Sequence, residues 1–253
     1  MYQYCGMAQI YDSFMNDDID YNAWADYLTD IFSFYGKTPH LIADLACGTG
    51  NISIPMSKRG YEVIGVDIST EMLDRARKKS SLAGQDILFL NQDITKLDLY
   101  GSVDAVLCMI DGINYITDPG RLKGMFKRLN TCFLNPGAVV VFDVSSVYKL
   151  SKVLGNNTFI YDTDDIYYGW QNSYIRQKRL CQMDLSFFIK SGTTYQRFDE
   201  THLQRAYSVR FLKGVLTNAG FTNINVFGEL TFDKPRKSEN RIVFTAQKPE
   251  NAE

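Results

Sequence analysis

Hydrophobic residues recur along most of this chain in blocks whose period changes from that of a strand to that of a helix and back. Short apolar runs predict strands at 41–45, 61–67, 87–90, 103–110 and 138–144. Between them, apolar positions at helical spacing predict helices at 51–59, 69–79 and 121–129. Strands that alternate with helices imply a mostly parallel sheet with both faces covered, so the sequence predicts an α/β fold.

The two ends of the chain complete this core. Residues 1–36 predict two helices around an acidic turn, with Asp20 as the N-cap of the second helix. Near the other end, we expect a helix at 209–218 and strands at 223–227 and 241–246. Because Pro55 disrupts a helix interior, the helix around it is expected to begin late enough to place this residue in or near its first turn.

The pattern changes between these parts. Residues 158–207 carry aromatic and β-branched residues in period-2 runs, with a turn at Lys190-Ser191-Gly192. This predicts three or four antiparallel strands. We therefore expect residues 1–144 and 208–253 to form the core, and residues 145–207 to be an inserted antiparallel β subdomain that serves as a lid or contacts the substrate.

The composition narrows the class of protein. A chain of 253 residues with 45% hydrophobic residues can bury a full core. A net charge of -2 and a pI near 5.8 give no general attraction to nucleic acid or anionic lipid. No apolar run approaches the ~20 residues of a membrane-spanning helix, and the first ten residues do not resemble a secretory signal. Five scattered cysteines and only two histidines predict a cytoplasmic protein without a metal site.

The turn at 44–50, Asp-Leu-Ala-Cys-Gly-Thr-Gly, directly follows the first predicted strand. Ligands of open parallel sheets bind where strands end and helices begin. Gly48 and Gly50 leave the backbone accessible and permit positive φ angles. Asp67, at the end of the second strand, can accept hydrogen bonds from both hydroxyls of a ribose. Together they indicate a cofactor that contains a nucleoside.

Two further residues distinguish the kind of cofactor. Ser53 stands where the dinucleotide fingerprint has its third glycine, which argues against a nicotinamide-dependent oxidoreductase. Asp44 would repel a pyrophosphate but could hold an ammonium group. The turn therefore favours a cofactor with a zwitterionic end.

At this point the sequence resembles the class I S-adenosylmethionine-dependent methyltransferases, and within them the small bacterial proteins with an N-terminal Tyr-Asp helix. Five motifs carry the resemblance in order: Tyr11-Asp12, the turn at 44–50, Gly65-Val66-Asp67-Ile68-Ser69 with Met72-Leu73, Gln92-Asp93-Ile94, and Leu134-Asn135-Pro136-Gly137. The resemblance implies a Rossmann-like core, a seven-stranded sheet with an antiparallel last strand, and S-adenosyl-L-methionine as cofactor, with S-adenosyl-L-homocysteine as product.

The resemblance also implies roles for individual residues. Gly48 and Gly50 would line the methionine part of the cofactor, and Asp67 would bind its ribose. The adenine would contact Ile68, Met72, Asp93 and Ile94. Asp44 and Tyr11 would hold the amino-acid end, and Ala46 and Met109 complete the expected cofactor set.

Methyl transfer needs a base only where the acceptor must lose a proton. Catalytic candidates follow the fourth strand or end the insertion: Asp111, Tyr115 and His202. Candidates for substrate binding are Asn114, Tyr168, Trp170, Arg205 and Tyr207.

Several of these residues have a plainer interpretation. Asp67 could cap the next helix, although Ser69 is the better cap. His202 could pack or bond Glu200, and Arg205 could pair with that glutamate instead of a substrate. The aromatic cluster around Tyr168 and Trp170 could form the small core of the insertion. Close packing explains Cys47 better than nucleophilic catalysis, because no histidine lies near it in the sequence.

The sequence therefore predicts a methyltransferase that acts by in-line transfer on a small molecule. Methylation of tRNA or protein is an alternative, for which a basic face would have to form from Lys58, Arg59, Arg75, Arg77, Lys78 and Lys79. A nicotinamide-dependent oxidoreductase and a binding module without turnover are further alternatives. The acceptor atom, whether carbon, nitrogen or oxygen, and the oligomeric state stay open at this stage.

Overall fold

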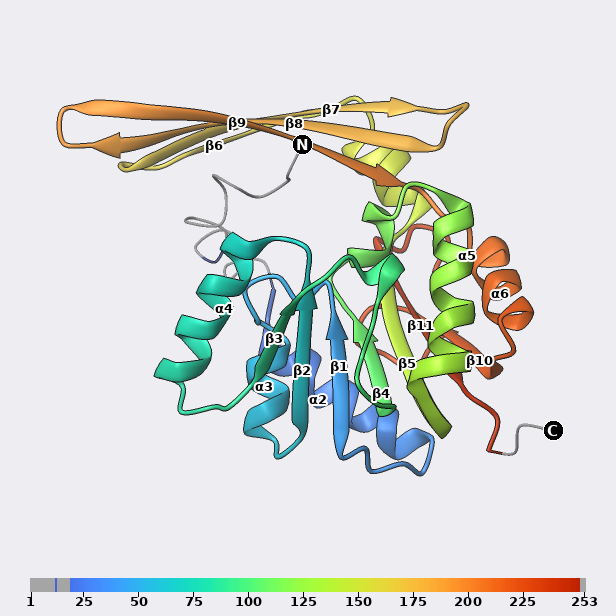
Figure 1. Cartoon of the computed structure of the whole chain (residues 1–253). Helices are drawn as coiled ribbons and strands as arrows, with labels where there is room; N and C mark the ends of the chain where they lie inside the picture. Colours follow the sequence, from blue (N-terminus) through green and yellow to red (C-terminus); the bar gives the residue numbers. More distant parts are fainter. Residues whose placement is uncertain (1–11, 13–18, 251–253) are drawn as a thin grey trace.

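A seven-stranded sheet forms the centre of the protein, which a computed structural model describes for residue 12 and residues 19–250 (Figure 1). Its strands are β1 Leu41–Leu45, β2 Glu62–Asp67, β3 Leu88–Asn91, β4 Val103–Cys108, β5 Leu134–Ser145, β10 Thr222–Phe227 and β11 Arg241–Gln247. Their order is β10-β11-β5-β4-β1-β2-β3, and β11 is antiparallel to both of its neighbours while the strands from β5 to β3 are parallel. The predicted fold class, including the antiparallel last strand, is confirmed.

Helices cover both faces of this sheet. They are α2 Tyr21–Phe34, α3 Ser53–Lys58, α4 Thr70–Leu82, α5 Pro119–Arg128 and α6 Val209–Asn218. Alternate residues of a strand enter different cores: Ala105 and Leu107 of β4 pack with residues of α2, α3 and α4, whereas Val106 and Cys108 pack with residues of α5 and α6. Strands buried on both faces explain the continuous apolar runs of the sequence.

The helix starts agree with the capping pattern. Asp20 accepts hydrogen bonds from the backbone N–H groups of Asn22 and Ala23, each at 3.0 Å, and so caps α2 as predicted. Ser69 caps α4 through a bond from the N–H of Met72 at 3.2 Å. Because α3 begins at Ser53, Pro55 lies in its first turn, where a missing N–H costs little.

Replacing Asp20 by alanine is expected to lower the free energy of unfolding by about 1 kcal/mol, since two N–H groups of α2 lose their acceptor. Chemical denaturation would measure this change. Asp30→Ala, at an exposed position of the same helix, is the matched control and is expected to be neutral. Equal destabilisation by both variants would show that the cap contributes nothing specific.

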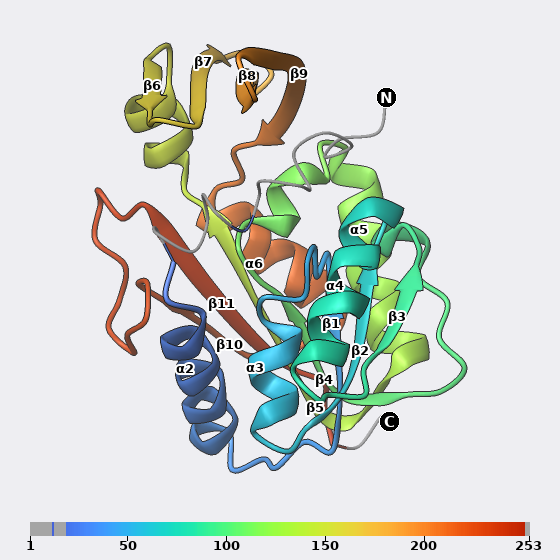
Figure 2. The same cartoon turned by 90° about the vertical axis from the view of Figure 1, so that its left-hand side faces the viewer.

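A second sheet is inserted between β5 and α6. It consists of β6 Thr158–Asp162, β7 Ile166–Ile175, β8 Leu180–Ser191 and β9 Thr194–Arg205, paired antiparallel in this order. Both cartoon views show it above the end of the core at which β1 and β2 finish (Figures 1 and 2). A short helix, η5 Lys149–Leu154, precedes it and was not expected from the sequence.

One face of this inserted sheet has its own small core. Cys181, Met183, Leu185 and Phe187 alternate along β8 and pack with Leu150 and Leu154 of η5, and the partly buried Tyr168 and Trp170 pack against the same cluster. The Tyr168 ring lies 5.4 Å from that of Phe187. Tyr168 and Trp170 therefore both pack within the core of the insertion.

The structure differs from the predicted pattern after β4. We expected the strand to continue to residue 110, but it ends at Cys108 because Ile110 and Asp111 both have a φ of 57°. The helical turn η3 Gly112–Tyr115 follows. Two more short helices, η2 Ile94–Lys96 and η4 Leu129–Phe133, were also missed. None of the described helices is long and apolar enough to cross a membrane.

Candidate cofactor and active site

The turn after β1 has the backbone conformation that its glycines allow. Gly48 and Gly50 have φ angles of +54° and +78°, and Ala46 between strand and turn has a φ of 55°. A Cβ atom on Gly48 would meet nothing within 4 Å, so a side chain there would project into the open space beside the turn. That space is therefore available to a ligand that approaches the backbone closely.

Two buried carboxylates flank this turn. Asp44, at 2% exposure, accepts a hydrogen bond from the hydroxyl of Ser53 at 2.5 Å. Asp67 accepts bonds from the backbone N–H groups of Gly48 at 2.9 Å and Ser69 at 2.8 Å. Burial raises the pKa of Asp44 to about 7, with a further contribution from the charge of Asp67, and burial also raises the pKa of Asp67. Two acids with raised pKa values at adjacent strand ends are suited to a cationic ligand.

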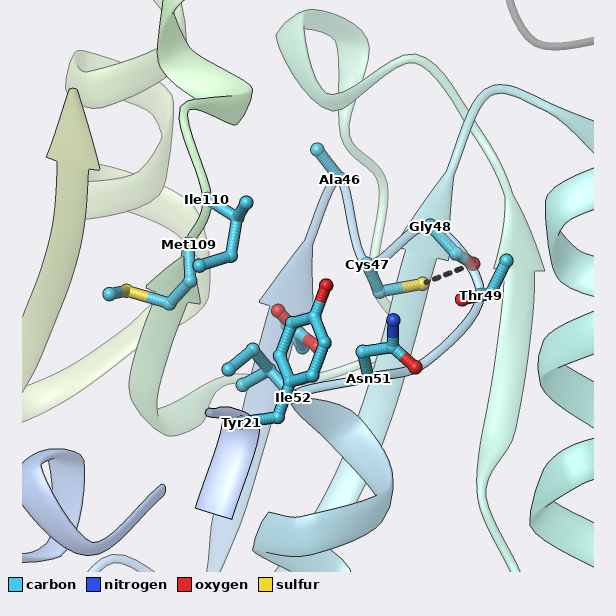
Figure 3. A pocket seen from close by; sticks show the side chains of 10 residues that line it. Tyr21, Ala46, Cys47, Gly48, Thr49, Asn51, Ile52, Met109 and Ile110 are labelled. Carbon is cyan, nitrogen blue, oxygen red and sulfur yellow. Dashed lines mark hydrogen bonds between the residues drawn. The ribbon is translucent and has the colours of Figure 1, made fainter. Parts of the chain in front are cut away.

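A pocket opens between this turn and the end of β4. Its lining comprises Tyr21, Asp44, Ala46, Cys47, Gly48, Thr49, Asn51, Ile52, Met109 and Ile110. Figure 3 shows the hydroxyl end of Tyr21 directed toward the turn, with Met109 and Ile110 on the opposite side. Burial raises the pKa of Tyr21 to about 12, so its hydroxyl stays a hydrogen-bond donor. Asp44, Ala46, Gly48 and Met109 of the predicted cofactor set thus meet in one pocket.

Asp12 lies against this turn. Its carboxylate accepts bonds from Thr49 at 2.6 Å and Asn51 at 3.0 Å, and it forms an ion pair with Lys79 of α4 at 2.8 Å. Burial opposes ionisation, but these three partners lower the pKa of Asp12. Tyr11, predicted to hold the amino-acid end of the cofactor, lies outside the described residues.

The remaining predicted cofactor residues lie near the ends of β2 and β3. Ile68 is 58% exposed, whereas Met72 and Ile94 are buried. Asp93 caps η2 through Thr95 and forms an ion pair with Arg121 at 2.5 Å. Burial, the largest single influence, raises the pKa of Asp93, but the bonds from Thr95 and the charge of Arg121 together lower it below its ordinary value. Ile68 therefore offers an apolar surface to a ligand, while the carboxylate of Asp93 already has partners.

Cys47 lies within the turn but is not suited to nucleophilic chemistry. Its side chain is buried, and burial, followed by the charges of Asp44 and Asp67, raises the pKa of the thiol well above its ordinary value. A Cβ atom on Gly65 would come within 3.1 Å of its sulfur. These contacts agree with the packing role expected from the sequence.

The turn η3 packs directly against the glycine-rich turn. A Cβ atom on Gly112 would lie only 2.9 Å from Cβ of Ala46, so a residue with a side chain does not fit there. Asn114 is fully buried, and its carboxamide bonds the N–H and C=O of Ser145 at 2.8 and 3.1 Å and the C=O of Arg205 at 2.9 Å. Asn114, predicted to bind substrate, thus holds η3 to β5 and β9.

Asp111 belongs to a buried charge cluster. Its carboxylate lies 3.0 Å from Arg241 of β11 and accepts a bond from Gln204 of β9 at 2.6 Å. Arg241 also pairs with Asp143 and, at 3.3 Å, with Glu229. Asp111, a predicted catalytic residue, thus links β11 and β9 within this cluster.

The other two predicted catalytic residues contact each other between η3 and β9 of the inserted sheet. The Tyr115 hydroxyl lies 3.4 Å from Nδ1 of His202. Nε2 of His202 lies 3.0 Å from the carboxylate of Glu200 on the same strand. Their neighbours bind backbone: Arg205 donates to the C=O of Thr117 at 2.5 Å, and Tyr207 donates to the C=O of Ile116. Arg205 thus bonds the backbone of Thr117, while Glu200 lies against His202.

Sequence reasoning missed several residues of the site. Tyr21, Asn51 and Ile52 line the pocket, and Ile110 has a positive φ that is uncommon for a β-branched residue. Asn51 and Ile52 follow the glycine-rich turn directly, so their position was a usable signal. Nothing in the spacing indicates that Tyr21, 23 residues before Asp44, faces this turn.

The residues at this site fit a nucleoside cofactor with an ammonium group. The open backbone at Gly48 leaves room, and the carboxylates of Asp44 and Asp67 suit an ammonium and ribose hydroxyls. Among the ten residues of the pocket lining there is no lysine or arginine to neutralise a pyrophosphate. The fold and the site therefore define a Rossmann-like protein that binds a nucleoside cofactor other than a dinucleotide.

Comparisons with known proteins give the same class. A family described as "Methyltransferase domain" matches residues 42–137. The "Putative methyltransferase YqeM" of Bacillus subtilis (strain 168) is 37% identical over 246 residues, which cover 97% of both chains. The crystal structure of an S-adenosylmethionine-dependent methyltransferase from Clostridium acetobutylicum ATCC 824 is 35% identical, covers 97% of this chain and 99% of that chain, and has a TM-score of 0.88.

A more distant structure shares the fold. It is S-adenosylmethionine-bound CalS10 from Micromonospora echinaspora, an amino pentose methyltransferase, with 16% identity, a TM-score of 0.72, and coverage of 94% of this chain and 96% of that chain. The chain belongs to the class I S-adenosylmethionine-dependent methyltransferase family, and S-adenosylmethionine is its cofactor.

Proposed function

We propose that this methyltransferase acts on a small molecule, which binds between the carboxyl edge of the core sheet and the inserted sheet. The observation that carries the proposal is the contact between Tyr115 of η3 and His202 of β9. It joins the turn beside the cofactor pocket to the face of the insertion, so an acceptor held there would be enclosed by both sheets. Residues 145–207 then act as a lid on a core formed by the rest of the chain.

The residues of the pocket have separate roles in this proposal. Asp67 accepts hydrogen bonds from the ribose hydroxyls, and Asp44 faces the ammonium of the amino-acid end. Gly48 lets the cofactor approach the backbone, and Ile68 contacts the adenine. Gly50 was expected beside the methionine part, but a Cβ atom there would meet Ala76 and Ile54, so this glycine serves the conformation and packing of the turn. The cofactor supplies a methyl group on a good leaving group, so orientation and exclusion of water are the main contributions of the protein.

A small acceptor is favoured over a nucleic acid. Three of the six residues that could build a basic face are paired with carboxylates: Arg59 with Asp26, Arg77 with Asp74, and Lys79 with Asp12. Such pairs reduce the positive potential that a phosphate backbone needs. CalS10, an amino pentose methyltransferase with a similar fold, also supports a small acceptor.

Calorimetric titration tests the cofactor site first. Binding of S-adenosylmethionine and S-adenosylhomocysteine, without binding of NAD, is the expected result.

A second experiment tests the class of acceptor. The purified protein and methyl-labelled S-adenosylmethionine are incubated in separate reactions with the small-molecule, RNA and protein fractions of a bacterial extract. Label should enter the small-molecule fraction, whereas transfer only to RNA or protein would refute the small-molecule proposal. Cofactor binding without any transfer would indicate a binding module.

A further inference from the structure

Glu200 and His202 lie two residues apart on β9, so their side chains share one face of the inserted sheet. Nε2 of His202 lies 3.0 Å from Oε2 of Glu200, and the side chains are 4% and 9% exposed, respectively. A carboxylate buried in this way is costly unless a partner compensates its charge. The contact between Glu200 and His202 is therefore a buried contact within the protein and not a contact at the surface.

This geometry determines which nitrogen of His202 carries the proton. An ionised carboxylate can only accept a hydrogen bond, so Nε2 donates to Glu200. In a neutral imidazole the other nitrogen is then an acceptor. That nitrogen, Nδ1, faces the hydroxyl of Tyr115 at 3.4 Å, and the two rings meet edge to face. In this neutral tautomer of His202, the hydroxyl of Tyr115 is the donor to Nδ1.

Tyr115 is also close to the cofactor site along the chain. It ends η3, whose first residue, Gly112, packs against Ala46 of the glycine-rich turn. Met109 and Ile110, immediately before η3, line the pocket. Three side chains thus form a hydrogen-bonded path from the turn beside the pocket to a buried acid of the insertion.

We propose that Glu200, His202 and Tyr115 form a proton relay and that the methyl acceptor is a hydroxyl or an ammonium group. Glu200 is a positioning residue, because it acts through the tautomer of His202. The proposal rests on the proposed function, since it describes the proton that methyl transfer at this site releases. A carboxylate acceptor has already lost its proton at neutral pH and would need no relay.

The proton and electrons balance as follows for a hydroxyl acceptor. The oxygen forms a bond to the methyl carbon, the bond from that carbon to sulfur breaks, and the electron pair stays on sulfur. The hydroxyl proton passes to the oxygen of Tyr115 while the Tyr115 proton passes to Nδ1 of His202. The imidazolium is paired with Glu200 and later releases its proton to solvent. For an ammonium acceptor the proton transfer precedes the attack, because the nitrogen lone pair must first be freed.

Nitrogen NMR of histidine-labelled protein tests the relay without turnover. The chain has two histidines, and the exposed His40 serves as an internal reference that His40→Gln assigns. The expected result for neutral His202 is a single tautomer with the proton on Nε2. In Glu200→Gln, an isosteric change, this preference should be lost, because an amide can either donate or accept. A proton on Nδ1 in the native protein, or an unchanged tautomer in the variant, would overturn the proposal.

Turnover with the labelled extract supplies the second measurement. Tyr115→Phe and Glu200→Gln are expected to slow methyl transfer roughly 100-fold while the Kd for S-adenosylmethionine stays the same. His40→Gln should retain the native rate. The labelled product should resist alkali, as ethers and methylamines do, and release of labelled methanol from an ester would contradict the relay. Failure of the native protein to bind the cofactor or transfer any label would instead refute the proposed function, and the tautomer would still decide the geometry of the relay.

Discussion

Replacing Asp67 by alanine is expected to weaken S-adenosylmethionine binding by about 1.5 to 3 kcal/mol, which corresponds to roughly 10- to 150-fold in Kd. Each oxygen of this carboxylate accepts one backbone N–H, from Gly48 or Ser69, and keeps a second lone pair for a ribose hydroxyl. In the proposed binding mode, the variant would lose both ribose bonds at once. Calorimetric titration measures the loss directly.

The alternative is that Asp67 has only a structural role. Its carboxylate bonds both Gly48 of the turn and Ser69 at the start of α4, and so it holds these two segments together. Its removal leaves two N–H groups without their acceptor and should also lower stability. Asp67→Asn keeps the size of the side chain and separates the two effects. Asp74→Ala, on the exposed side of α4, is the matched control. Destabilised variants that retain native cofactor affinity would remove Asp67 from the binding site.

The second large effect is a dependence of cofactor affinity on pH. Asp44 has a pKa of about 7 in the protein without ligand, because it is buried and lies near the charge of Asp67. Its ionised form binds an ammonium, and the ammonium of an α-amino group stays protonated below pH 7. Affinity for S-adenosylmethionine should therefore fall roughly tenfold between pH 7 and pH 5.5.

Asp44→Asn provides the comparison. Its affinity should be low and nearly independent of pH, because no proton competes with the ammonium at this position. A native protein whose affinity is flat over the same range would show that Asp44 does not face the ammonium. The sign for stability is opposite: the folded protein without cofactor holds this proton more tightly than an unfolded chain with a pKa of 3.8, so it loses stability as the pH rises from about 4 to 7.

The sequence predicted those parts of the site that lie within one short segment. The turn at 44–50 and Asp67 were recognisable because glycine conformations and strand ends are local properties. Ser53 illustrates what was only half predicted. Because Ser53 stands where the dinucleotide fingerprint has its third glycine, the sequence argued against a dinucleotide cofactor. The hydrogen bond from Ser53 to Asp44 became visible only in the structure.

Contacts between distant segments were not predictable in this way. Tyr115 and His202 were both named as catalytic candidates, yet nothing in a spacing of 87 residues indicates that they meet. Arg205 and Tyr207 have side chains that bond backbone carbonyls about 90 residues away. A side chain suited to substrates can equally satisfy buried backbone, and only the fold decides which partner it meets.

One side chain, Asn114, bonds both the last residue of β5, Ser145, and the last residue of the inserted sheet, Arg205. The insertion therefore leaves and re-enters the core beside the same buried side chain. Its hairpins can lengthen, shorten or change their side chains without moving the strands that hold the cofactor. With the inserted sheet in its proposed role, such a junction would let one cofactor-binding core carry different acceptor-binding sheets, so that specificity could change while the core stays the same.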